Sequence, residues 1–120
     1  MKPTDVNHAR FILDSVWPVI YDDGEFSVVW GAWVDDQGKA CPKSLGMRWN
    51  ESPGPNGFPT SGPTFRPVWL VIPQELSVPF TASLLGKPFA NPKAILNVLQ
   101  QLETGGDLTP KPETPAMQAA

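Results

Sequence analysis

The feature that most constrains this chain is a pair of β-type segments joined by a tight-turn sequence. In Phe26–Val34 the even positions carry Phe, Val, Trp, Ala and Val, whereas the odd positions carry Ser, Val, Gly and Trp. A period of two is what a β-strand imposes on its side chains. Residues 35–38 have the sequence Asp-Asp-Gln-Gly, which is typical of a turn, and a second segment with strand character follows at 39–49. An antiparallel hairpin is therefore predicted over residues 26–49.

The hairpin also carries signs of local irregularity. Gly31 lies between two tryptophans, which indicates a bulge or a close backbone approach. Pro42 and Gly46 interrupt the return segment, so this strand is predicted to be an edge strand or to contain a bulge. Neither face of Phe26–Val34 is polar enough for full solvation. We therefore expect helices on one face, and either the long loop or another subunit on the other.

A long loop and a strongly apolar segment follow the hairpin. Residues 50–64 are rich in Pro and Gly and show no periodicity. Loops of this length inside a compact domain are usually either functional or mobile. Residues 68–72, Val-Trp-Leu-Val-Ile, form the most apolar run of the sequence and do not alternate. This pattern predicts a strand that is buried on both faces.

Three helices are predicted outside these strands. Residues 4–15 repeat apolar side chains at helical spacing, and Pro18 ends that pattern. A short helix is predicted over 77–86, with an extended segment as the alternative. Residues 91–103 begin with Asn and Pro, which favour the cap and the first helical position, and continue with a clear apolar stripe.

Together these patterns predict an α+β fold. We expect a small, mainly antiparallel sheet of three or four strands, with the N-terminal helix and one or two C-terminal helices packed on one face. A chain of 120 residues that is 41% apolar suffices for one domain, which we place at residues 1–106. Residues 107–120 contain three prolines and little apolar area, so we predict a disordered, Pro-rich tail there.

Net charge and targeting signals exclude several classes of protein. The formal net charge is −3 and the sequence pI is about 4.9, which argues against a general DNA-binding protein. No apolar run approaches the ~20 residues of a membrane-spanning helix, and no signal peptide is recognisable. Cys41 is the one cysteine, so no internal disulfide can form, which fits a reducing compartment. We therefore expect a soluble cytoplasmic protein without membrane contact.

The residues needed for common catalytic and metal sites are scarce. His8 and Cys41 are the sole histidine and cysteine, which excludes a tetrahedral zinc site made of these residue types within one chain. His8 is expected inside the first helix, either with its hydrogen bonds satisfied or facing solvent, and Cys41 is expected to be a buried, inert thiol. The acidic residues at 22–23 and 35–36 fit ordinary turns better than a calcium loop or a catalytic pair. We predict no catalytic residues, no metal and no cofactor.

One cluster of residue types stands out around the long loop. Arginine and aromatic side chains dominate binding hot spots because they combine large area with directed hydrogen bonds. The predicted binding residues are Arg48, Trp49, Asn50, Phe58, Phe65 and Arg66. Two interpretations stay open at this point. Either these residues form a groove for an acidic or aromatic ligand, or Trp49 and Trp69 belong to the core, Phe58 pins the loop, and the arginines are solvated.

The leading functional hypothesis is a small, non-enzymatic binding protein, an adaptor or inhibitor that acts by protein–protein contact. Its partner would be another protein, or a second copy bound through a partly apolar sheet face. One alternative is a binder of single-stranded nucleic acid or of an acidic ligand through the arginine and aromatic cluster, which the acidic net charge disfavours. Another is a small-molecule enzyme with a pocket under the 50–64 loop.

Overall fold

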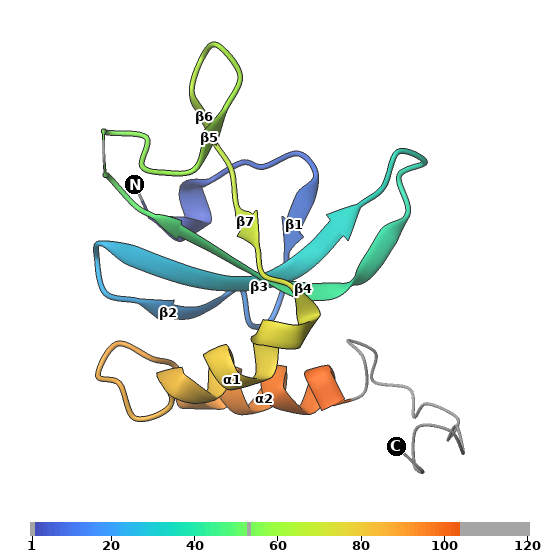
Figure 1. Cartoon of the computed structure of the whole chain (residues 1–120), viewed down its shortest axis with the longest axis vertical. Coiled ribbons are helices and arrows are strands. Elements are labelled where there is room, and N and C mark those ends of the chain that lie inside the picture. The colour runs from blue at the N-terminus through green and yellow to red at the C-terminus, as the bar shows by residue number, and fades with distance from the viewer. Residues whose placement is uncertain (1, 53, 104–120) are drawn as a thin grey trace.

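The computed structural model describes residues 2–52 and 54–103 and contains an antiparallel sheet with two helices on one face (Figure 1). Five strands form the main sheet: β1 (Phe11–Leu13), β2 (Val19–Asp22), β3 (Phe26–Val34), β4 (Ala40–Trp49) and β7 (Leu70–Val71). Their order is β1-β3-β4-β7, and β2 also pairs with β3, next to β1. All these pairings are antiparallel. The predicted α+β class and antiparallel sheet are therefore confirmed, whereas the predicted number of three or four strands is too low, because short segments such as β1 also pair.

The remaining elements are short apart from the two helices. The chain opens with a 3₁₀ helix, η1 (Pro3–Asp5), and residues 60–67 form a small ribbon of β5 (Thr60–Ser61) and β6 (Arg66–Pro67). The helices are α1 (Gln74–Leu84) and α2 (Pro92–Glu103). In Figure 1 they lie side by side below the sheet, and the β5–β6 ribbon projects from the opposite end. The predicted tail, residues 107–120, lies outside the described residues.

The predicted hairpin over residues 26–49 is present as β3 and β4. Between the pairs Ala32↔Lys43 and Val34↔Ala40 the register shifts, because β4 spans three residues where β3 spans two. This places a bulge at residues 41–42, where proline removes a backbone donor. The sequence predicts either an edge strand or a bulge for the return strand, and the bulge is the correct alternative. Strand β4 lies between β3 and β7 and is not an edge strand.

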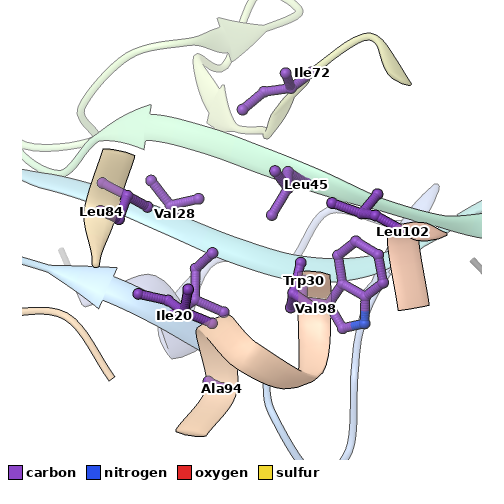
Figure 2. Close-up of a cluster of buried hydrophobic side chains, with 10 residues drawn as sticks. Ile20, Val28, Trp30, Leu45, Ile72, Leu84, Ala94, Val98 and Leu102 are labelled. Atoms are coloured by element: carbon purple, nitrogen blue, oxygen red, sulfur yellow. The ribbon is translucent and has the colours of Figure 1, made fainter. Parts of the chain in front are cut away.

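The larger core lies between the sheet and the helices. Trp30 on β3 is fully buried there, opposite Leu45 on β4, and the apolar stripe of α2 packs over both (Figure 2). Ala90 forms a bridge to Tyr21, and Asn91 donates its backbone N–H to Ile20 O, which fixes the start of α2 against β2. The buried members are Ile20, Val28, Trp30, Leu45, Ile72, Leu84, Ala94, Ile95, Val98 and Leu102.

A second, smaller core lies on the other face of the sheet. It consists of Val6, Phe11, Val29 and Trp69, so the N-terminal segment covers this face in place of the long loop or another subunit. Gly31 makes the close packing feasible, because a Cβ atom there would lie 2.4 Å from the carbonyl oxygen of Ile12. The predicted close backbone approach at Gly31 is therefore confirmed.

The predicted helix over residues 4–15 is wrong. Only Pro3–Asp5 is helical, and Phe11–Leu13 pairs with β3 as strand β1. Ile12, an apolar residue of the predicted helix, is 54% exposed. Backbone pairing to β3 and the burial of Phe11 over the sheet outweigh the local helical spacing, which is a weak determinant in a tertiary context.

The prediction of a central, doubly buried strand over residues 68–72 is also wrong. Only Leu70–Val71 pairs, and it does so at the edge of the sheet against β4. The run is apolar for a different reason: Trp69 enters the smaller core, Ile72 enters the larger one, and Leu70 between them is exposed. Trp69 is nevertheless a core residue, as one of the two open interpretations required.

Both C-terminal helices are present. Helix α1 begins at Gln74, three residues before the predicted start, and continues through Pro79, so the helical alternative for this segment is correct. Helix α2 has the predicted bounds, and Asn91 caps it by accepting a hydrogen bond from the backbone N–H of Ala94 at 3.3 Å. Within the described residues, no helix is long and apolar enough to cross a membrane.

Candidate functional site

Arg48 is an internal anchor of the long loop. Its side chain is 1% exposed and lies on the face of β4 that carries the smaller core. Nε donates to Val68 O at 3.1 Å, and Nη2 donates to Asn56 O at 2.6 Å and Pro59 O at 3.2 Å. The guanidinium carbon lies 5.9 Å from the ring centre of Trp69. Arg48 therefore connects the loop to strand β4 and to the segment before β7, and its charge is not exposed to solvent.

Burial also changes the acid–base character of Arg48. Removal of the guanidinium from water lowers its pKa from the ordinary value. The carbonyl dipoles that accept its hydrogen bonds partly replace the lost hydration, which keeps the group charged and bound in place. The Nη1 atom is buried and has no partner within the described residues.

Asn50 is a second buried anchor, at the end of β4. Its Oδ1 accepts a hydrogen bond from Ser27 Oγ at 2.8 Å, and its Nδ2 donates to Asp22 Oδ1 at 3.1 Å. The backbone N–H of Asn50 donates to Glu25 O at 2.6 Å. These contacts join the start of the long loop to the turn between β2 and β3, so Asn50 fixes the position of the backbone that follows Trp49.

Trp49 and Phe58 hold the loop against the end of β4. Trp49 N donates to Phe58 O at 2.6 Å, and Phe58 N donates to Trp49 O at 3.0 Å. Gly57 allows this approach: its φ is +68°, and a Cβ atom would lie 2.1 Å from Trp49 O. The two aromatic side chains are 47% and 53% exposed, so backbone pairing holds the residues while their rings face solvent. Trp49 also meets Phe26 edge to face at 5.1 Å.

Phe65 and Arg66 lie on the β5–β6 ribbon. Phe65 is 65% exposed and adopts a φ of +53°, and its carbonyl oxygen accepts a hydrogen bond from Asn56 Nδ2 at 3.1 Å. Arg66 pairs with Ser61 across the ribbon and is exposed. A hollow of about 420 Å³ opens between the ribbon and the loop, and we call it the loop hollow. Its lining consists of Gly54, Pro55, Asn56, Gly57, Phe58, Thr60 and Phe65.

A second hollow lies on the other side of Trp49. It has a volume of about 390 Å³ and we call it the tryptophan hollow; it is lined by Gly24, Glu25, Trp49, Glu51 and Ser52. Sequence reasoning missed Glu25 and Glu51, which lie on either side of the long hairpin. The register Phe26↔Trp49 brings them together, and extending the predicted hairpin by two residues, to the pairs 25↔50 and 24↔51, would have indicated this proximity.

His8 has a structural role outside the predicted helix. Its Nδ1 accepts a hydrogen bond from the backbone N–H of Trp69 at 3.0 Å, which requires an unprotonated Nδ1. Burial, and secondarily the charge of Arg10, lowers the pKa of His8. His8 lines neither hollow. Cys41 is half-buried at the bulge of β4.

Within residues 2–52 and 54–103, no group of three or more His, Cys, Asp or Glu side chains is placed to hold a metal ion. What the arrangement offers is contact area. The exposed rings of Phe58 and Phe65 line the loop hollow, and the exposed ring of Trp49 lines the tryptophan hollow, on backbone that buried anchors fix. Comparison with protein-family models, with curated proteins and with solved structures finds no significant match to this chain.

Proposed function

We propose that this chain is a non-enzymatic binding protein that contacts a partner protein through an aromatic loop surface. We define this surface by its exposed members, Trp49, Phe58, Phe65 and Arg66. The observation that carries the proposal is the exposure of three large aromatic side chains, two of which line the loop hollow, on backbone that Arg48 and Asn50 hold from inside. Aromatic and arginine side chains of this kind supply most of the binding free energy at protein interfaces.

The anchoring of the loop supports a binding role. Ordering a flexible loop on binding costs free energy, and a loop that is already held avoids much of that cost. Here Arg48 holds the carbonyl groups of Asn56 and Pro59, and the backbone pair of Trp49 and Phe58 closes the same segment. The aromatic rings are thus presented in one arrangement before a partner arrives.

The charges around the surface favour a protein over a nucleic acid. A single-strand binder pairs phosphates with exposed cations beside its stacking rings. Arg48 is buried, which leaves Arg66 as the exposed arginine of the predicted pair, and the carboxylates of Glu25 and Glu51 flank Trp49. The enzyme alternative receives no support from the loop hollow, whose described lining residues carry no ionisable side chain.

A cytoplasmic location, expected from the lone Cys41, is part of the same proposal.

Site-specific photocrosslinking tests the proposal. Benzoylphenylalanine is placed at position 58 or 65 in the full chain, and the matched control carries it at position 96, where Leu96 is equally exposed on α2. Irradiation in the native cell should join one protein to positions 58 and 65 and not to position 96. That protein, once purified, should bind the unmodified chain. The proposal would be overturned if the same proteins crosslinked at all three positions, or if positions 58 and 65 crosslinked to RNA.

A further inference from the structure

We infer that the tryptophan hollow binds a basic side chain, an arginine above all, of the partner protein. This inference deepens the proposed function and rests on it. Two features of the hollow point to such an occupant: an exposed indole ring on one side and carboxylates on the other. A guanidinium group stacks on aromatic faces and pairs with carboxylates through its planar donors, so one arginine can use both features together.

The aromatic side of the hollow is Trp49. Its ring is almost half exposed while its backbone pairs with Phe58 and its inner edge meets Phe26. Indole is the best of the aromatic rings for attracting a cation, and a ring held in place loses little entropy when it does so. The exposed part of Trp49 is therefore a preformed contact for a cation.

The acidic side is Glu25, joined by Glu51. The Glu25 carboxylate has no hydrogen-bond or ion-pair partner within the described residues, although its backbone is fixed. Asp23 Oδ1 accepts hydrogen bonds from the backbone N–H groups of Glu25 and Phe26 at 2.9 and 2.7 Å. These hydrogen bonds lower the pKa of Asp23, and the bond from Phe26 has the largest effect. The Asp23 carboxylate therefore stays ionised and holds the backbone of the turn. Glu25 is thus positioned and available.

The neighbouring surface extends the negative field. An adjoining hollow of about 310 Å³ shares Gly24 and Glu51 with the tryptophan hollow. Among the described residues, its lining adds the carboxylates of Asp5 and Asp22 and the ammonium group of Lys2. Asp22 Oδ1 already accepts hydrogen bonds from Gly24 N and Asn50 Nδ2. Asp22 therefore adds to the negative potential at the hollow without contacting the occupant directly. Charge complementarity therefore favours a cationic occupant. The exposed ring of Phe58, whose backbone pairs with that of Trp49, supplies apolar area for the residues that flank this occupant.

An NMR titration with N-acetyl-L-arginine amide tests the inference on the full chain. The expected result is a saturable shift of the Trp49 indole N–H and of the Gly24 and Glu25 amide signals. N-acetyl-L-citrulline amide has nearly the same shape without the charge, and it should bind at least tenfold more weakly. Added salt should weaken the binding of the arginine probe, because salt screens charge pairs that are partly exposed to solvent. Equal binding of both probes, or no shift at these residues, would overturn the inference.

Two substitutions assign the two sides of the hollow. Glu25→Gln should weaken the arginine probe about fivefold, as expected for one partly exposed charge pair. Trp49→Leu should abolish the saturable shift of the Gly24 and Glu25 amides. The matched control is Glu75→Gln, which removes an exposed carboxylate on α1 outside the hollow and should leave the titration unchanged. If Glu25→Gln and Glu75→Gln bind the probe alike, Glu25 is not part of the site and the inference fails.

The same measurements separate this inference from the proposed function. If a partner crosslinks at positions 58 and 65 but the arginine probe does not bind, the surface is a protein interface without a basic side chain in the tryptophan hollow. If the probe binds and no protein crosslinks at those positions, the hollow recognises a guanidinium group but the aromatic loop surface is not the interface.

Discussion

At the scale of single residues, Arg48 decides how the loop is held. Its guanidinium donates hydrogen bonds to the backbone carbonyl groups of Asn56, Pro59 and Val68. An alanine at this position would remove these hydrogen bonds and would leave a cavity beside Trp69. Among the described residues, only the Pro59 acceptor keeps a further donor, Val68 N. Arg48→Ala should therefore lower the free energy of unfolding by about 2–4 kcal/mol, measured by urea denaturation. The exposed Arg66→Ala should change it by less than about 0.5 kcal/mol, and equal losses for both would contradict the anchoring role.

His8 couples stability to pH. The folded state lowers the pKa of His8 because of burial and, secondarily, Arg10, so the unfolded chain binds a proton more readily. Stability from this group is fully present above the unfolded value of about 6.5 and decreases as pH falls toward the lower folded pKa. Between pH 6.5 and 5 the midpoint of urea denaturation should fall, and in His8→Asn, whose amide oxygen can accept the Trp69 N–H bond, that decrease should be smaller. A decrease of the same size in the variant would assign it to other groups.

At the scale of elements, β1 depends on the absence of a side chain at Gly31. A Cβ atom there would also lie 2.9 Å from the Phe11 ring, besides its conflict with Ile12 O. Gly31→Ala should displace β1 and reduce stability by about 1–3 kcal/mol in thermal or urea unfolding. Gly54→Ala is the matched control, because a Cβ atom at Gly54 meets nothing within 4 Å. The close approach would be refuted if both variants unfolded at the same temperature.

The elements also show which parts of the fold local sequence can predict. The hairpin, its bulge and helix α2 follow from patterns within one segment: alternation, a proline, and a capped apolar stripe. Strand β1 does not, because its partner is about twenty residues away and its apolar spacing also fits a helix. Residues 68–72 mislead for a related reason, since their apolar side chains serve two cores on opposite faces. Long-range pairing overrides local propensity in both places.

The candidate site divides in the same way. Composition around the loop singled out these residue types, and in the structure Trp49, Phe58, Phe65 and Arg66 are exposed. It did not predict that Arg48 and Asn50 lie inside, because alternation assigns a residue to a face of the sheet and does not say what covers that face. The turn geometry that exposes Phe65, with its positive φ, has no signal in the residue type, since glycine is the residue expected there.

At the scale of the whole molecule, the parts that stabilise the fold and the part proposed to bind a partner lie in different places. The helices and the N-terminal segment bury the two faces of the sheet, and the aromatic loop surface lies beyond them at the end of β4. The chain after residue 106 has little apolar area to bury. Deletion of residues 107–120 should thus shift the melting temperature by less than about 4 °C, which is roughly 1 kcal/mol for a domain of this size. A larger fall would mean that this segment contributes to the fold.

The most direct test of the account is to measure stability and partner affinity in the same loop variants. Phe58→Ala and Phe65→Ala should leave the free energy of unfolding within about 0.5 kcal/mol of the parent, because both rings are exposed. Each should weaken binding of the crosslinked partner, measured by calorimetry, at least about fivefold, equivalent to about 1 kcal/mol. Leu96→Ala should change neither quantity. Unchanged affinity in both phenylalanine variants, or unfolding of Phe58→Ala, would contradict the account and make the loop a part of the core.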